Sequence, residues 1–351
     1  MKMMTIVGAR PQFVKAAVVS THLRQSAHEI LVHTGQHYDV NMSDIFFTEL
    51  GIPAPDYHLG IGSGLHGAQT GKMLAEIEQV CLQEKPDCLL IYGDTNSTLA
   101  GALAASKIHI PIAHVEAGLR SFNRRMPEEI NRVVADHLAT WLFAPTRTAI
   151  TNLNQEGIRQ GVYRTGDVMY DAFLQMSKRV GTQSRILDTL GLTPRKYCLV
   201  TLHRAENTDD PRRLQAILST LAGLDDPVIF PIHPRTRGKL AEYHMSFEGK
   251  SLKFIEPIGY FDMLNLELNA KMIFTDSGGV QKEAYMAKTP CITLRDETEW
   301  VETVEAHWNR LVGADPEGIR EAVSLDWVGS AYPDLFGDGV AGAQIAEILT
   351  K

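Results

Sequence analysis

The residue types best able to do acid–base chemistry are concentrated in residues 114–132, HVEAGLRSFNRRMPEEINR. This stretch contains three glutamates and four arginines: Glu116, Glu128, Glu129, Arg120, Arg124, Arg125 and Arg132. A run of charges usually marks a solvated surface, but the apolar residues 110–115 that lead into it are typical of a buried strand. Glu116 would then stand at the carboxyl end of that strand, where open parallel sheets bind ligands. A carboxylate there loses hydration, so its position predicts a charged partner or ligand.

Other charged groups follow strand-like segments in the first half of the chain. Asp94 follows one of them, and Arg10 lies in the turn after residues 2–8. Lys15 comes one helical turn later, near the start of a helix predicted for residues 13–25. We interpret Arg10 and Lys15 as cations that meet a diphosphate near a helix N-terminus, although a solvated pair fits the same pattern. No GxGxxG and no Walker lysine follow these segments, so a dinucleotide or P-loop fingerprint is missing.

Polar residues also follow three strand-like segments in the second half, at 201–207 (TLHRAEN), 231–235 (PIHPR) and 276–283 (DSGGVQKE). In the last of these, Ser277, Gly278 and Gly279 would open a helix whose free N–H groups can bind phosphate without a metal. Glu283, further into that helix, can accept hydrogen bonds from a ribose. An S-G-G turn is nearly as often a plain helix cap, and lone histidines such as His203 and His233 are more often structural.

Apolar segments alternate with helical patterns along the chain, which is typical of parallel sheets covered on both faces. The predicted strands are 2–8, 29–34, 89–92, 110–115, 141–145, 197–202, 228–232, 252–255, 272–275 and 291–294, and a terminal helix is predicted for 341–349. The pattern breaks between residues 163 and 184, where Gly166–Asp167 indicates a crossover. We therefore predict two α/β halves with a cleft between them, a common place for a ligand.

Composition limits the function classes. The chain has 351 residues, 44% hydrophobic and 22% charged, which fits a soluble protein of two domains. A net charge of −8 argues against general nucleic-acid binding. Four scattered cysteines without a CxxC pair predict buried, reduced thiols. We expect no signal peptide, no membrane span and no metal site, and hence a cytoplasmic protein.

Taken together, these motifs closely resemble the non-hydrolysing UDP-N-acetylglucosamine 2-epimerases. The resemblance rests on GARPQ with Lys15, TGQHYD, GDTNSTLAGALAA, HVEAGLRS, MPEEINR, TLHRAEN, HPRT, TDSGGVQKEA and GDGVAGAQIAEIL, which span the chain in the family's order. It implies two Rossmann-like domains facing a central cleft, the GT-B-like architecture, and a homodimer that supplies surface polysaccharide synthesis. The implied domains are residues 1–165 with the catalytic carboxylates, 166–334 binding UDP, and a terminal helix at 335–351 that packs back on the first.

The resemblance also implies roles for individual residues. The expected UDP-binding residues are Arg10, Lys15, His203, Ser277, Gly278, Gly279, Glu283 and Arg310. The expected catalytic residues around the sugar are Asp94, Glu116, Glu128 and His203. In the family, UDP is eliminated to give a 2-acetamidoglucal and then re-added, with a proton delivered to the opposite face of C2. This needs a base, an acid and stabilisation of the departing diphosphate, and no cofactor. The sequence leaves open which carboxylate is the base.

Some positions depart from the family's common pattern. Gln12 stands where many members have Glu, and Met263 where an aromatic often flanks the uracil. Tyr38–Asp39 and Ala68–Gln69 replace Arg–Gln pairs of members that a second substrate molecule activates, so allosteric activation stays open. The loop after Glu116 is two residues shorter than in those members and carries Arg124 and Arg125.

These departures resemble the branch that acts on UDP-2,3-diacetamido-2,3-dideoxyglucuronate. Arg124 or Arg125 could pair with the extra carboxylate of that substrate, although both could simply be solvated. We keep UDP-N-acetylglucosamine as the first prediction and the uronate as the alternative. Two other classes are weighed against these: a GT-B glycosyltransferase, which would need an acceptor, and a UDP-sugar sensor, which would bind without turnover.

Overall fold

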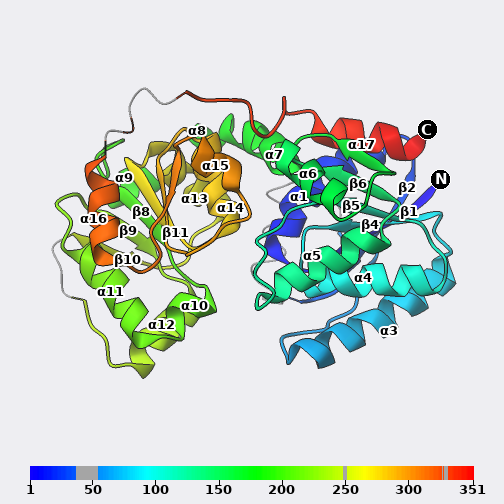
Figure 1. Cartoon of the computed structure of the whole chain (residues 1–351), viewed down its shortest axis with the longest axis horizontal. Coiled ribbons are helices and arrows are strands. Elements are labelled where there is room, and N and C mark those ends of the chain that lie inside the picture. Colours follow the sequence, from blue (N-terminus) through cyan, green and yellow to red (C-terminus); the bar gives the residue numbers. More distant parts are fainter. Residues whose placement is uncertain (37–53, 248–250, 326, 328–330) are drawn as a thin grey trace. The chain divides into compact units, whose positions relative to one another are not determined.

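The computed structural model describes residues 1–36, 54–247, 251–325, 327 and 331–351 (Figure 1). The chain divides into two units. Unit 1 comprises Met1–Leu174 together with Asp334–Lys351, and unit 2 comprises Gln175–Pro333. Unit 1 is therefore built from two separate parts of the sequence.

Unit 1 is organised around a seven-stranded sheet of order β3-β2-β1-β4-β5-β6-β7, in which all pairs are parallel. Its strands are β1 (Lys2–Val7), β2 (His28–His33), β3 (Tyr57–His58), β4 (Cys88–Tyr92), β5 (Ile112–Val115), β6 (Trp141–Ala144) and β7 (Val162–Arg164). Its helices are α1 (Arg10–Leu23), α3 (His66–Glu84), α4 (Asn96–Lys107), α5 (Pro127–Leu138), α6 (Arg147–Gln155) and α17 (Ala341–Thr350), with α7 (Val168–Ser177) running on into unit 2.

Unit 2 repeats the design with a six-stranded parallel sheet of order β10-β9-β8-β11-β12-β13. Its strands are β8 (Cys198–Thr201), β9 (Val228–Pro231), β10 (Leu252–Ile255), β11 (Met272–Thr275), β12 (Cys291–Thr293) and β13 (Asn309–Leu311). Its helices are α8 (Val180–Gln183), α9 (Ile186–Leu190), α10 (Ala205–Thr208), α11 (Pro211–Ala222), α12 (Pro234–Glu242), α13 (Tyr260–Asn269), α14 (Gly278–Met286), α15 (Val301–Glu305) and α16 (Pro316–Ser324).

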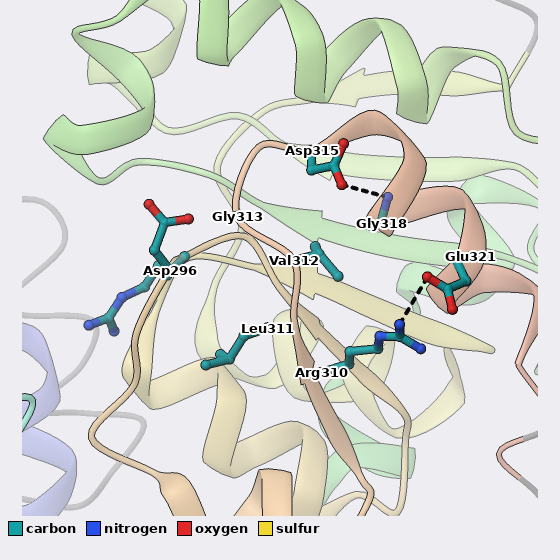
Figure 2. Close-up of a pocket in the computed structure, with 9 residues that line it drawn as sticks. Asp296, Arg310, Leu311, Val312, Gly313, Asp315, Gly318 and Glu321 are labelled. Atoms are coloured by element: carbon teal, nitrogen blue, oxygen red, sulfur yellow. Dashed lines mark hydrogen bonds and ion pairs between the residues drawn. The ribbon is translucent and has the colours of Figure 1, made fainter.

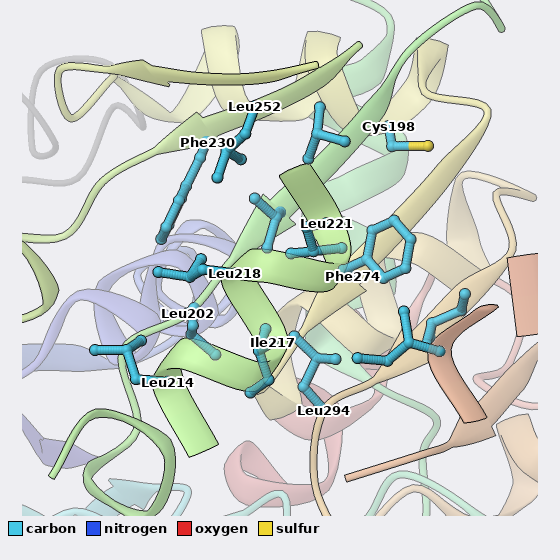
Figure 3. Close-up of a cluster of buried hydrophobic side chains, with 14 of the residues drawn as sticks. Cys198, Leu202, Leu214, Ile217, Leu218, Leu221, Phe230, Leu252, Phe274 and Leu294 are labelled. Atoms are coloured by element: carbon cyan, nitrogen blue, oxygen red, sulfur yellow. The ribbon is translucent and has the colours of Figure 1, made fainter. Parts of the chain in front are cut away.

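The core of unit 2 shows why its helices form where they do (Figure 3). Helix α11 buries one apolar stripe with helical spacing, made of Leu214, Ile217, Leu218 and Leu221. This stripe packs in the same cluster as Phe230 and Phe274 from the sheet. Packing of this kind leaves the strand ends free to carry polar residues.

The strand order locates the ligand-binding edge of each sheet. In both units the order reverses beside the first strand, between β1 and β4 in unit 1 and between β8 and β11 in unit 2. Open α/β sheets bind ligands beyond the carboxyl ends of strands at such a switch point. Each unit therefore has one edge where a ligand is expected.

Helix α17 joins unit 1 by packing on α1, with the red C-terminal helix beside the blue N-terminal part in Figure 1. Gly342 makes the close approach possible, because a Cβ there would lie 2.5 Å from Val18 Cγ1. The Gly342 N–H donates to Asp171 Oδ2 at 2.8 Å. Ile345, Ala346 and Leu349 of α17 are buried.

The structure confirms the predicted α/β class with two parallel sheets, and every predicted strand is present within one or two residues of its predicted ends. One prediction is wrong: α1 begins at Arg10, not at residue 13. Pro11 fits the first turn, where its missing N–H is not needed, and the Gln12 side chain accepts the N–H groups of Gly8 and Ala9. The short edge strands β3, β7 and β13 carry too few apolar residues to have been predicted.

The four cysteines are buried free thiols, as predicted, and burial raises the pKa of each to about 12. Within the part of the chain that the structure describes, no helix is long and apolar enough to cross a bilayer.

Candidate functional site

In unit 1, two carboxylates stand at the carboxyl ends of neighbouring strands. Asp94 follows β4, and Glu116 follows β5. Each is paired with a buried cation: Glu116 with the Lys15 ammonium, and Asp94 with the Arg132 guanidinium. The structure thus brings together Asp94, Glu116 and Lys15, which the sequence placed on three separate elements.

Gly93 makes this arrangement possible. Its φ is +60°, and a Cβ there would lie 3.1 Å from Glu116 Oε2 and 3.2 Å from Lys15 Nζ. A glycine both adopts the left-handed turn without strain and leaves room for the ion pair. Glu116 itself has a φ of +72°, an unfavourable conformation for a non-glycine residue that is often found at functional sites.

Helix α5 holds the loop that follows Glu116. The Glu129 carboxylate accepts the N–H groups of Ser121 and Phe122 at 3.0 and 2.9 Å, and it also pairs with Arg132 Nη1 at 2.8 Å. Arg132 therefore bridges Glu129 and Asp94. The sequence analysis assigned no role to Arg132, although its three-residue spacing from Glu129 places both on one helix face.

The remaining predicted residues of unit 1 are less enclosed. Glu128 lies half-buried in the first turn of α5, while Arg124 and Arg125 are exposed on the loop before it. Arg10 is the first residue of α1, and its side chain lies outside what the structure describes. Tyr38–Asp39 also lie outside the described residues.

Gln12 has a structural role that its amide explains. Its Oε1 accepts the Gly8 and Ala9 N–H groups, and its Nε2 donates to Tyr92 O at 2.7 Å. An ionised glutamate could make only the first set of bonds, because it has no hydrogen to donate. The amide therefore connects the ends of β1 and β4, on either side of the switch point.

In unit 2, helix α14 begins without a side-chain cap from its own N-cap residue. Its N-cap, Ser277, makes no capping bond with its side chain, whereas Asp210 and Asp315 cap α11 and α16 of the same unit. The Ser277 side chain therefore does not occupy the first N–H groups of α14, which a phosphate-binding helix start requires, although the Glu299 carboxylate lies against Gly278 in the same turn.

The turn that carries His203 is tied to β11 by a buried carboxylate. Asp276 is fully buried and accepts the N–H groups of His203 and Arg204, the latter at 2.9 Å, and an N–H of the Asn207 amide. The His203 ring is partly exposed and lies 5.5 Å from the His233 ring, centroid to centroid. Sequence reasoning missed Asp276; its signal was a carboxylate directly before the S-G-G turn.

Two other predicted UDP-binding residues occupy different places in unit 2. Glu283 is buried within α14, and its Oε1 accepts the Tyr260 hydroxyl at 3.3 Å. Arg310 lies on β13 and pairs with Glu321 at 3.0 Å (Figure 2). It lines a pocket of about 360 Å³ with Arg295, Asp296, Leu311, Val312, Gly313, Asp315, Gly318 and Glu321. Ser277, Gly278, Gly279 and Glu283 are not among the residues that line this pocket, and a shared role of Arg310 with them stays a prediction.

Among the described residues, no group of three or more His, Cys, Asp or Glu side chains could hold a metal ion. What the described geometry offers is paired carboxylates beside cations in unit 1 and an uncapped helix start in unit 2. Such groups suit proton transfer and binding of a phosphate ester.

Comparison with known proteins gives consistent matches over the whole length. Residues 21–350 match the family model described as UDP-N-acetylglucosamine 2-epimerase. A UDP-N-acetylglucosamine 2-epimerase homolog of Methanococcus maripaludis is 54% identical over 99% of both chains. The UDP-2,3-diacetamido-2,3-dideoxy-D-glucuronate 2-epimerase of Pseudomonas aeruginosa is 51% identical over the full length of both chains. The crystal structure of Methanocaldococcus jannaschii UDP-GlcNAc 2-epimerase with UDP-GlcNAc and UDP matches with a TM-score of 0.94 and 47% identity, over 100% of this chain and 99% of that one.

Proposed function

We propose, from the premise that this chain belongs to the UDP-N-acetylglucosamine 2-epimerase family, that it interconverts UDP-N-acetylglucosamine and UDP-N-acetylmannosamine. The observation that carries the proposal is the pair of carboxylates Asp94 and Glu116, each fixed by a buried cation beside the switch point of unit 1. Inversion at C2 needs groups that remove and return a proton on opposite faces of the sugar. Two oriented carboxylates on neighbouring strands supply them.

The C2 hydrogen has no adjacent carbonyl, so the reaction proceeds by elimination. A carboxylate among Asp94, Glu116 and Glu128 removes the C2 proton while the C1–O bond to UDP breaks, which leaves a 2-acetamidoglucal. UDP then adds back to C1 as a proton is delivered to the other face of C2. The bonds broken in the first step are restored in the second, so no cofactor is consumed.

We assign binding of the nucleotide part of the substrate to unit 2. The departing diphosphate carries the charge that develops in the transition state, and N–H groups at the start of α14 can stabilise it without reorganisation. Glu283 can accept a ribose hydroxyl, and His203 and Arg10 would contact the diphosphate. Lys15, already beside Glu116, would neutralise the leaving group near the reacting carbon.

A second candidate substrate is UDP-2,3-diacetamido-2,3-dideoxyglucuronate, on which the Pseudomonas aeruginosa relative acts. The observation that favours it is the exposure of Arg124 and Arg125 on the loop between Glu116 and Glu128. Glu129 holds the backbone at Ser121 and Phe122, so the two arginines follow a fixed part of this loop. Guanidinium groups bind carboxylates in a bidentate manner that ammonium groups cannot match.

The test is proton NMR in D2O, with each sugar nucleotide supplied alone. Deuterium at C2 and appearance of the manno isomer from UDP-N-acetylglucosamine is the expected result. Exchange only with the uronate would transfer the assignment to the second candidate. In that case Arg124→Ala and Arg125→Ala should raise KM for the uronate, whereas Arg159→Ala, at an exposed arginine elsewhere in unit 1, should not. No exchange with either compound would contradict both assignments.

We also propose that the protein acts as a cytoplasmic homodimer whose product supplies surface polysaccharide synthesis, the arrangement implied by its family. Light scattering coupled to size-exclusion chromatography measures the mass directly. A mass of one chain, 38.9 kDa, at micromolar concentration would contradict the dimer.

A further inference from the structure

A buried histidine connects the two turns that carry the catalytic carboxylates. His114 lies on β5, two residues before Glu116, and it is fully buried. Its Nδ1 lies 2.7 Å from Asp136 Oδ1 on α5, and its Nε2 lies 2.7 Å from the carbonyl oxygen of Gly93. Gly93 directly precedes Asp94, so the ring contacts the backbone of one catalytic turn and lies next to the other.

Both of these partners accept hydrogen bonds and neither donates one. A backbone carbonyl has no hydrogen to give. Apart from the ring, Asp136 accepts two more bonds, from Gly118 N at 3.1 Å and Arg120 Nη1 at 2.7 Å. Its two oxygens thus face donors on every described side, as those of an ionised carboxylate do. Each ring nitrogen of His114 must therefore carry a hydrogen, which makes the ring an imidazolium.

The charges around the His114 ring also favour the imidazolium form. Arg120 makes a bidentate pair with Glu156, with both N···O distances 2.7 Å, in addition to its bond with Asp136. With a charged His114, the cations His114 and Arg120 balance the carboxylates Asp136 and Glu156, and the exposed His137 ring lies 3.9 Å from Glu156 at the edge of this network. A neutral His114 would leave Asp136 and Glu156 to share the charge of Arg120, and an uncompensated buried charge is costly.

The network spans both catalytic turns. Through Nε2, His114 fixes the Gly93 carbonyl and so the start of the Asp94 turn. Through Asp136, it fixes Gly118, which lies two residues after Glu116. Asp136 and Arg132 are both on α5, and Arg132 pairs with Asp94. One charged ring therefore links the positions of Asp94, Glu116 and α5.

We propose that His114 is a positioning residue, held as an imidazolium, whose two N–H groups set the separation between the catalytic carboxylates Asp94 and Glu116. The proposal rests on the proposed epimerase function for its kinetic consequence, but not for the protonation state of the ring. His114 lies beneath the reacting groups and acts through Gly93 and Asp136 rather than on the sugar.

The protonation state is measured without any substrate. Nitrogen-15 NMR of the whole protein with ring-labelled histidine should show, at neutral pH, one side chain with two protonated ring nitrogens that exchange slowly with solvent. This signal should be absent in His114→Gln. A neutral His114 ring, with one bare nitrogen, would overturn the proposal whatever the activity of the enzyme.

The positioning role is measured by steady-state kinetics. In His114→Gln the amide can bond Gly93 or Asp136 but cannot replace both ring N–H groups, so kcat should fall about 100-fold, as expected for a misplaced reacting group. Affinity for UDP should stay within about twofold, because the assigned nucleotide contacts lie elsewhere. Asp136→Asn should lower kcat similarly, and the double variant should lose little more, since both changes break the same unit.

The matched control is Glu29→Gln. Glu29 is also a buried carboxylate in unit 1, bonded to Thr5, Ser20 and Arg24, but it lies at the start of β2, away from the catalytic turns. The Glu29→Gln variant should be less stable than the wild type but should have the same kcat. Equal kcat values in His114→Gln and Glu29→Gln at matched stability would reduce His114 to a structural residue and refute the positioning role. An inactive wild type would instead refute the epimerase, and the NMR result would still decide the state of the ring.

Discussion

Asp94 and Glu116 are each oriented by one buried cation. This pairing predicts how substitution of each carboxylate by its amide should affect turnover. Asp94→Asn and Glu116→Gln keep the size of each side chain but remove its capacity to take up a proton. We expect turnover to fall about 100-fold or more in each variant, with UDP affinity largely retained. Stopped-flow NMR or coupled assays give turnover, and calorimetry gives UDP affinity. Full turnover in both variants would remove the catalytic assignment.

His203→Ala and Arg10→Ala should show the opposite pattern, with weaker UDP binding as the first effect. Loss of a charge-assisted hydrogen bond to a phosphate typically costs about 1.5–3 kcal/mol, or roughly tenfold or more in affinity. Calorimetry with UDP alone measures this directly. Unchanged affinity in both variants would exclude the diphosphate contact.

A comparison of two glycine variants can separate the effect of backbone strain from the effect of crowding at the Glu116–Lys15 ion pair. Gly93→Ala and Gly157→Ala each place a side chain at positive φ, +60° and +83°, and each should cost about 1–2 kcal/mol of stability. Only at Gly93 would the new Cβ meet the Glu116–Lys15 pair; at Gly157 nothing lies within 4 Å. We expect at least about tenfold lower kcat for Gly93→Ala alone. Equal kcat values in the two variants would exclude crowding of the ion pair.

His33 makes stability depend on pH. Burial, followed by the charge of His58, lowers the pKa of His33 to about 4 from an ordinary 6.5, and its ring stacks between Phe13 and His58. Above pH 6.5 the ring is neutral in both states and the stability is complete. Between pH 6.5 and 4 only the unfolded chain takes up the proton, so stability falls by about 1.4 kcal/mol per unit, about 3 kcal/mol in all.

Urea unfolding at pH 7.5 and pH 5 tests this dependence. His33→Phe should reduce the difference in the free energy of unfolding between the two pH values, because the ring that resists protonation is removed while the stacking is kept. His28→Gln, at an exposed histidine of the same strand, should leave the difference unchanged. The same pH dependence in His33→Phe and wild type would rule out His33 as its source.

At the scale of single elements, the turn after β8 depends on a carboxylate from β11. Asp276→Asn keeps one acceptor for the N–H groups of His203 and Arg204 but turns an amide N–H group toward other donors. We expect a raised Kd for UDP with smaller change in kcat, because the displaced group is His203. The control is Asp210→Asn, which weakens a cap on the exposed start of α11. An equal loss of UDP affinity in this variant would show that the effect comes from general destabilisation.

Strands and their order of appearance were predictable because buried parallel strands are continuous apolar runs, as in residues 88–92 and 272–275. The start of α1 was not, because Gln12 supplies an unusual side-chain bond at the helix start. Sequence also placed Asp94, Glu116 and Ser277 at strand ends. It could not show that Arg132 reaches Asp94, or that Arg310 turns toward Glu321. Those pairings depend on which helix face packs inward and on side-chain direction.

For the whole molecule, unit 1 depends on residues at both ends of the sequence. Gly342→Val would push α17 away from Val18 and should cost unit 1 about 1–3 kcal/mol. Hydrogen exchange should show faster exchange in α1 and α17 while unit 2 stays protected. Gly71→Ala, in α3 with nothing within 4 Å, should be neutral or stabilising. Equal loosening of both units by Gly342→Val would contradict a local effect.

The discontinuity of unit 1 also affects how the protein is made. Domains usually fold in the order in which they leave the ribosome. Here Asp334–Lys351, which unit 1 needs, is translated after all of unit 2. The nascent chain can therefore complete unit 2 first, at a stage when α1 of unit 1 still lacks α17 to cover it. During that interval the surface of α1 around Val18 stays uncovered until synthesis delivers the missing helix.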